Sequence, residues 1–188
     1  EQCGDNTYDL EANLAILRLY QFNQNQIDHK VIIKILLKAL TALPKPDFGL
    51  CKGLIDPKFF EEDEIDLNLK HVLHLHQLLE LCDFSEFWTV LRSDPGVYLG
   101  IAGFDDSIRQ YICYVVKITY QTINKATLRE LLGGLDDSQL KYWIQVNKWK
   151  EMDDGYVFIA NQEELIKSKN IKEKIEFDSI ARVVAAYK

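Results

Sequence analysis

The sequence has few cysteines, and they lie far apart. Only four occur in 188 residues: Cys3, Cys51, Cys82 and Cys113. So sparse a set suits neither the disulfide framework of a small secreted domain nor a zinc knuckle. The chain also lacks a basic leader followed by an apolar run, and it has no Asn-x-Ser/Thr acceptor. These absences predict a protein of a reducing compartment, cytoplasmic, with the nucleus as a second location.

Long hydrophobic runs are missing as well. The apolar stretch "YICYVV" ends at Lys117, far short of the roughly 18 residues that a membrane span needs. With 47% hydrophobic and 27% charged residues, the composition is that of an ordinary globular protein. A chain of this length should bury roughly 70% of its unfolded surface. We therefore expect one or two small folded domains and no contact with a membrane.

The sequence also has none of the short motifs that usually accompany catalysis, such as GxGxxG, GxxxxGK[ST], HExxH or GxSxG. His71, His74 and His76 lie near Cys82, but at 100° per residue on a helix His76 points about 140° away from His71. The acidic run "EEDEID" at 61–66 has no glycine turn of the kind that a calcium loop requires. We predict no enzyme activity, no cofactor, no metal site and no small-molecule substrate.

Positive charge is not in excess anywhere. The net charge is −7; residues 1–124 carry 11 basic and 18 acidic residues, and residues 125–188 carry 11 of each. Proteins that neutralise phosphates usually have the opposite balance. Charge therefore does not favour a nucleic-acid partner.

What the chain does contain is helical periodicity. Asp9 is a predicted N-cap for a helix over 9–22, and Pro44 and Pro46 end the next one, over 28–43. A shorter helical pattern follows around "DFGLCKGLI", and further helices are predicted over 65–82 and from Asp83 onward. Consecutive helices with short connections favour a HEAT-like helical-repeat domain over residues 1–107.

The pattern changes in residues 108–188. Asp105, Asp106 and Ser107 are predicted to cap a helix that runs to about residue 121, and "TINKA" is a predicted strand. Two short helices, "TLRELLG" and "DDSQLKYWIQVNK", precede the strands "WKEM" and "YVFIA", which are joined by the turn "DDG". This is the order of a small winged-helix domain with a β-hairpin wing. Gly133 and Gly134 end the first short helix, and Asp178 begins a C-terminal helix.

The second short helix holds the position of a DNA-reading helix, and its charges oppose that role. It begins with Asp136 and Asp137, where bases and phosphates would lie. Its side chains Leu140, Trp143 and Ile144 are predicted to be buried.

A nucleic-acid-binding winged helix remains the alternative function. The lysines that would serve it are Lys141, Lys148 and Lys150, and a second stripe of Lys30, Lys34 and Lys38 would contact RNA or an acidic protein.

Seven stretches carry a resemblance to known proteins: "YDLEANLAILRLYQF", "ILLKALTALPKPDFGLCKGLID", "LLELCDFSEFW", "GFDDSIRQYICYVVKITYQTI", "LGGLDDSQLKYWI", "YVFIANQEELIKSKNI" and "EKIEFDSI". At these stretches the chain resembles the subunit K family of eukaryotic translation initiation factor 3, a family of PCI-like scaffold proteins. The family usually has a further helix before the start of this sequence, and we expect trimming to explain its absence. The connection "DPKFFEEDEIDLNLKH" is longer than is usual in the family.

The resemblance implies a mainly α fold and a non-catalytic subunit in translation initiation. It implies other subunits of the factor as partners, chiefly subunit L, and contact with the small ribosomal subunit through the complex. A PCI-type scaffold of another assembly, such as the proteasome lid or the signalosome, is a further alternative.

Two surfaces are candidates for the protein contacts. A hairpin that ends in aromatic residues, here Tyr156 and Phe158, offers a neighbouring protein both an edge and a face. A terminal amphipathic helix can join a bundle of partner helices, and its stripe consists of Ile180, Val183, Val184 and Tyr187. The alternative for this stripe is that it packs on its own domain.

Overall fold

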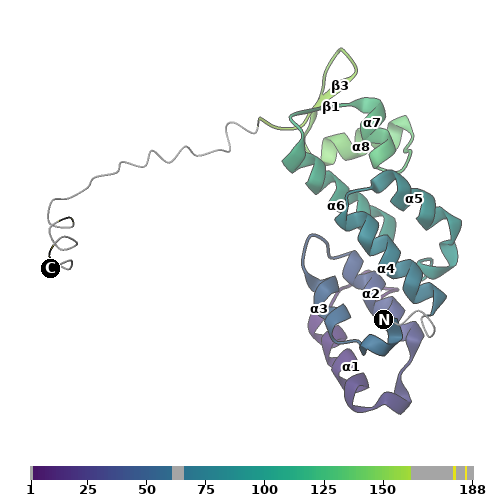
Figure 1. Ribbon diagram of the computed structural model, residues 1–188. Helices are drawn as coiled ribbons and strands as arrows, with labels where there is room; N and C mark the ends of the chain where they lie inside the picture. The colour runs from purple at the N-terminus through teal and green to yellow at the C-terminus, as the bar shows by residue number, and fades with distance from the viewer. Residues whose placement is uncertain (1, 61–65, 162–179, 181–184, 186–188) are drawn as a thin grey trace.

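The computed structural model describes residues 2–60, 66–161, 180 and 185. Within them the first part of the chain is a series of α-helices: α1 (Leu10–Phe22), α2 (His29–Leu40), α3 (Asp47–Gly53), α4 (Leu67–Glu80) and α5 (Phe84–Ser93). Short 3₁₀ segments lie between them at Gln24–Gln26 and Pro57–Phe60, and a third follows α5 at Pro95–Val97. Figure 1 shows these helices stacked from α1 at one end of the molecule toward the centre.

The helices of this first part begin mostly at aspartates. The carboxylate of Asp9 accepts a hydrogen bond from the N–H of Ala12, at 3.0 Å, so the predicted cap of α1 is confirmed. Asp28, Asp66 and Asp83 accept backbone N–H groups in the same way at the starts of α2, α4 and α5. A cap of this kind contributes about 0.5–2 kcal/mol. Each helix start is therefore specified by residues next to it in the sequence.

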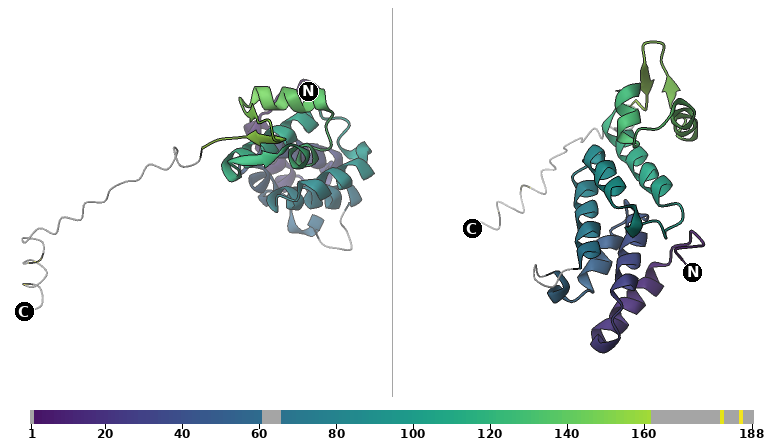
Figure 2. Two further views of the ribbon diagram at one scale, coloured as in Figure 1. Left: turned by 90° about the horizontal axis from the view of Figure 1, so that it is seen from above. Right: turned by 90° about the vertical axis from the view of Figure 1, so that its right-hand side faces the viewer.

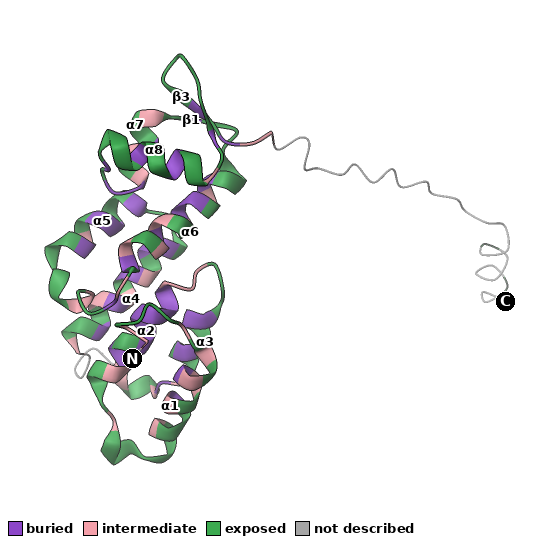
Figure 3. Ribbon diagram, turned by 180° about the vertical axis from the view of Figure 1, so that it is seen from behind, coloured by how far each residue is buried: buried purple, intermediate pink, exposed green. Residues whose placement is uncertain are grey.

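Helix α2 is the centre of the helical core. It contacts α1, α3 and α4, and most of its side chains are buried, including the fully covered Leu36, Leu37 and Leu40. Phe48 of α3 and Phe87 of α5 add fully buried aromatic rings. Figure 3 shows the buried residues on the inward sides of the helices.

The second part adds three helices and a small sheet to the described structure. Its elements are α6 (Phe104–Thr119), β1 (Thr122–Asn124), α7 (Lys125–Leu131), α8 (Asp137–Val146), β2 (Lys150–Glu151) and β3 (Tyr156–Phe158). The strands are antiparallel in the order β1-β3-β2. In Figure 2 the hairpin of β2 and β3 projects at the end of the molecule opposite α1. The predicted mainly helical class is confirmed, with a three-stranded sheet.

The predicted start of α6 is wrong. The helix begins at Phe104, and its N-cap is Gly103, whose φ of 69° is left-handed. Asp105 and Asp106 lie in the first turn instead, and the Ser107 hydroxyl donates to the carbonyl of Gly103 at 2.9 Å. The expected boundary between residues 107 and 108 therefore falls inside one continuous helix.

Three side chains from α5 and α6 hold the end of α7. The indole N–H of Trp88 donates to the carbonyl of Leu131 at 2.9 Å, and Nε of Arg109 donates to the carbonyl of Leu132 at 3.2 Å. The guanidinium of Arg92 donates to the carbonyl of Gly133. These carbonyls belong to the last turn of α7 and the residues just after it, where a helix has no backbone donors of its own. The three donors satisfy them and join the two parts of the chain; we call this set the α7 clamp.

Gly133 allows this close packing. Its φ is 90°, and the N–H of Gly134 donates to the carbonyl of Arg129 at 2.8 Å, which confirms the predicted glycine end of α7. A Cβ placed on Gly133 would lie 2.9 Å from two ring atoms of Trp88. Any other residue here would strain the backbone and also displace the indole.

We expect Gly133→Ala to destabilise the protein by about 2–4 kcal/mol, since a left-handed alanine costs roughly 1–2 kcal/mol and an overpacked contact costs a similar amount. Gly134→Ala is the matched control, because Gly134 has a φ of 71° but its nearest outside atom is 4.0 Å away. It should lose only the backbone part, about 1–2 kcal/mol. Urea unfolding of both variants measures the difference. Equal losses of unfolding free energy in the two variants would show that the contact with Trp88 contributes nothing to stability.

Candidate functional site

The outer face of the small sheet carries two exposed aromatic side chains. Tyr156 and Phe158 are 42% and 37% exposed, whereas Val157 between them is fully buried. In the central strand, Phe158 lies between Thr122 of β1 and Lys150 of β2. Because side chains alternate along a strand, both rings point away from the core. The two residues predicted for the hairpin therefore share one accessible surface, which we call the wing face.

The hairpin that presents the wing face is firmly attached to the domain. Trp149, just before β2, is buried. The N–H of Met152 donates to the carbonyl of Tyr156 at 2.8 Å, and Gly155 turns the chain with a φ of 82°. An ion pair of 2.8 Å joins Lys125 at the start of α7 to Glu151 on β2. These contacts fix the position of the two exposed rings.

The acidic residues at the start of helix α8 have structural roles. The Asp136 carboxylate accepts hydrogen bonds from the backbone N–H of Gln139 and from the hydroxyl of Ser138, each at 2.7 Å. In turn, the side-chain oxygen of Gln139 accepts a hydrogen bond from the backbone N–H of Asp136. The hydrogen bond from the Gln139 backbone, followed by that from Ser138, holds the pKa of Asp136 below its usual value. Asp137 pairs with Arg129 of α7. The negative charges are thus a capping box and an ion pair.

The remaining surface of α8 is partly apolar. Leu140, Trp143 and Ile144 are buried, as predicted. Lys141 is exposed on α8, and so are Lys148 and Lys150 beyond its end; two further exposed side chains of α8 were not predicted from the sequence pattern. Those are Tyr142, 61% exposed, and Val146, 54% exposed. They lie four residues apart, a helical spacing that the sequence contains, although the buried stripe beside it is stronger.

The predicted lysine stripe on α2 is shorter than expected. Lys30 and Lys34 are exposed, but Lys38 is 3% exposed, and burial lowers its pKa. Lys38 is therefore not part of an accessible basic surface. This corrects the expected three-lysine contact.

The terminal stripe is described at one of its positions. Ile180 is 46% exposed. Val183, Val184 and Tyr187 lie outside the described residues, as does most of the acidic run 61–66.

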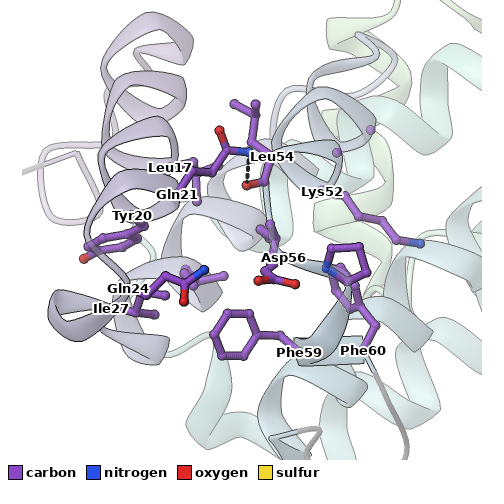
Figure 4. A pocket seen from close by; sticks show the side chains of 15 residues that line it. Leu17, Tyr20, Gln21, Gln24, Ile27, Lys52, Leu54, Asp56, Phe59 and Phe60 are labelled. Carbon is purple, nitrogen blue, oxygen red and sulfur yellow. Dashed lines mark hydrogen bonds between the residues drawn. The ribbon is translucent and has the colours of Figure 1, made fainter.

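An apolar pocket of about 620 Å³ lies at the far end from the sheet, between the end of α1 and the segment that follows α3. In Figure 4, Tyr20 and Gln24 come from one wall and Phe59 and Phe60 from the other. The size suits a ligand. Two of its polar side chains serve the fold, however: Gln21 donates to the carbonyl of Leu54 at 2.9 Å, and Asp56 accepts the N–H of Lys58 at 3.1 Å.

The histidines are not gathered into a site. The ring of His76 stacks on Phe48 with centroids 3.7 Å apart, and burial lowers its pKa. His74 is exposed and His71 half-buried. Across the described ranges, no group of three His, Cys, Asp or Glu side chains is arranged to hold a metal ion.

The buried cysteines are unsuited to nucleophilic chemistry. Burial raises the pKa of Cys51 to about 11 and that of Cys113 to about 12. Both are therefore thiols, not thiolates, at neutral pH. Cys82 is exposed in the left-handed turn that ends α4.

None of the described helices is long and apolar enough to cross a membrane.

Comparison with known proteins gives relatives along nearly the whole chain. The chain is 50% identical over 185 residues to human eukaryotic translation initiation factor 3 subunit K, covering 98% of this chain and 83% of the human protein. Proteins of the same name from Nematostella vectensis and Drosophila sechellia are 46% and 45% identical over 185 residues, with 84% and 82% of their lengths covered. A family model described as CSN8/PSMD8/EIF3K matches residues 26–170. The chain belongs to this family, and these relatives of 45–50% identity are subunit K proteins of eukaryotic translation initiation factor 3.

Proposed function

We propose that the chain is a non-catalytic scaffold subunit of the eukaryotic translation initiation factor 3 complex. It acts in the cytoplasm, in translation initiation on the small ribosomal subunit, through contacts with other subunits. The names of its relatives support the complex. The proposed mode of action rests on the wing face, where Tyr156 and Phe158 are exposed on a hairpin anchored by the buried Trp149.

Two folding units underlie this function in our proposal. The element order from α6 to β3, with the strand order β1-β3-β2, supports a winged helix. The stacked helices before it support a HEAT-like repeat, and the division proposed at residue 107 falls near the start of α6. A repeat of this kind gives a stiff arm, and the winged helix at its end presents the docking surface.

Subunit L is the partner that the family resemblance indicates. The wing face offers it two aromatic rings for burial, and aromatic residues often dominate the binding energy of protein interfaces. The edge strand β2, which is only two residues long, lies beside them. The partner therefore gains most of its contact from the face of the sheet.

We expect the double variant Tyr156→Ser/Phe158→Ser to bind purified subunit L at least about tenfold more weakly, because both anchors are lost. Tyr114→Ser is the matched control: Tyr114 is 46% exposed on α6 and is not part of the wing face. Affinity is measured by titration calorimetry, and thermal unfolding checks that each variant is folded. Unchanged affinity of a folded double variant would refute the wing face as the docking surface.

The terminal stripe is the second proposed contact, supported by the exposure of Ile180. We expect Val183→Asp/Val184→Asp to reduce binding of subunit L with little change in thermal stability, because a partner bundle would have to bury both charges. A stability loss with unaltered binding would assign the stripe to packing on its own domain.

A function in protein docking also predicts that the chain does not bind nucleic acid. We expect no measurable binding of single-stranded RNA or duplex DNA at 50 mM salt in fluorescence anisotropy, since the start of α8 carries Asp136 and Asp137. Binding that falls steeply with salt, and less steeply after alanine replaces Lys141, Lys148 and Lys150, would favour the nucleic-acid alternative.

A further inference from the structure

The wing face continues from its two aromatic rings onto the neighbouring strands. Phe158 has Thr122 on one side and Lys150 on the other. Met152, two residues after Lys150, donates its N–H to the carbonyl of Tyr156 at 2.8 Å and so lies across from that ring. Directly opposed side chains of antiparallel strands point to the same side of the sheet. These five residues are all exposed, and they form one surface.

Lys150 is the one charged residue among these five. The next residue of β2, Glu151, is opposed to the buried Val157 and turns to the other side of the sheet, where it forms an ion pair of 2.8 Å with Lys125. Across the part of the chain that the structure describes, Lys150 takes part in no ion pair. Strand β2 therefore has a neutralised charge toward the domain and an unpaired cation on the wing face.

This cation restricts which surfaces can cover the rings. Opposed residues of neighbouring strands have Cβ atoms about 4.5–5.5 Å apart, so a protein that covers Phe158 also reaches Lys150. An ammonium group that loses its water without gaining an acceptor opposes binding, whereas one that meets a carboxylate favours it. Strand β2 is at the edge of the sheet, so the carboxylate would lie at the border of the contact.

We propose that the wing face recognises an apolar surface of subunit L that carries a carboxylate at its border, and that Lys150 forms an ion pair with this carboxylate. The proposal rests on the proposed docking of subunit L at the wing face and adds the chemistry that the docked surface must have. Tyr156, Phe158 and Met152 supply apolar area for burial. Lys150 discriminates between apolar surfaces, because it disfavours those that offer no negative charge.

Two rings beside a lysine on a sheet could also stack the bases of single-stranded nucleic acid. The charges around the wing face favour a protein instead. A nucleic-acid strand requires several cations along its backbone, whereas a single carboxylate requires only one. The turn that follows Met152 carries the exposed Asp153 and Asp154, which would repel phosphates. Lys150 is thus placed for one negative charge and not for a chain of them.

The test is titration calorimetry of purified subunit L with the full chain and with three variants of Lys150. Lys150→Arg keeps the charge and should bind within about twofold of the unmodified chain. Lys150→Met should bind about threefold to tenfold more weakly, because the carboxylate of subunit L then has no cation. Lys150→Glu should bind at least about tenfold more weakly, since like charges meet. Raising the salt concentration from about 0.05 to 0.5 M should weaken binding of the unmodified chain more than that of Lys150→Met.

Lys70→Glu is the matched control, because it makes the same change of charge at an exposed position of α4, in the helical stack. It should bind like the unmodified chain, and thermal unfolding should show every variant folded. The double variant Tyr156→Ser/Phe158→Ser, in the same titration, separates the ion pair from the docking itself.

If the double variant binds weakly while Lys150→Met and Lys150→Glu bind like the unmodified chain, docking at the wing face stands and the ion pair is refuted. If all of these variants bind like the unmodified chain, the docking and the ion pair are both refuted. Binding of single-stranded RNA by the unmodified chain that is lost in Lys150→Glu would assign the cation to phosphate and would overturn the proposal as well.

Discussion

The arrangement of the whole molecule depends on how the end of helix α7 is satisfied. A helix leaves its last carbonyls without backbone donors, and here Trp88, Arg92 and Arg109 supply them. Two of the donors come from α5, in the first part of the chain, and the third comes from α6, in the same part as α7. The Arg109 guanidinium also lies 5.2 Å from the centre of the Trp88 ring, so the donors support one another. The sheet, and with it the wing face, is thereby oriented against the helical stack.

The local features of this fold could be predicted from the sequence, whereas the wrong predictions concern features that depend on residues far away in the sequence. The cap at Asp9 and the glycine end of α7 at Gly133 each depend on residues within about five positions. The start of α6 was predicted wrongly because its geometry depends on the beginning of the chain. The N–H of Ala102 donates to the carbonyl of Cys3 at 2.8 Å, and the side chain of Asn6 lies against Gly103. No pattern within α6 contains that contact.

The same distinction applies to the candidate site. Alternation along a strand was enough to put Tyr156 and Phe158 on one face, but only the packing of the sheet, which buries Val157 on the other face, shows that this face is open. The spacing of Lys30 and Lys38 suggested a single stripe, but eight residues at 100° each rotate the second side chain by about 80°. That rotation is enough to turn Lys38 from solvent into the core. Spacing by fours predicts neighbours on a helix and does not predict a straight exposed row.

Helix α8 shows how a position suited to reading nucleic acid can serve another purpose. Its acidic residues are committed to structure, because Asp136 caps the helix and Asp137 pairs with Arg129 of α7. Between Lys141 and Lys148, the exposed surface contains Tyr142 and Val146. Burial of tyrosine and valine side chains against another protein lowers the free energy of the complex, because water is excluded from their apolar surface. Phosphates provide no comparable apolar contact. The helix is therefore better suited to brace and border a protein interface than to enter a groove, and its acidic start repels the phosphates that such entry would require.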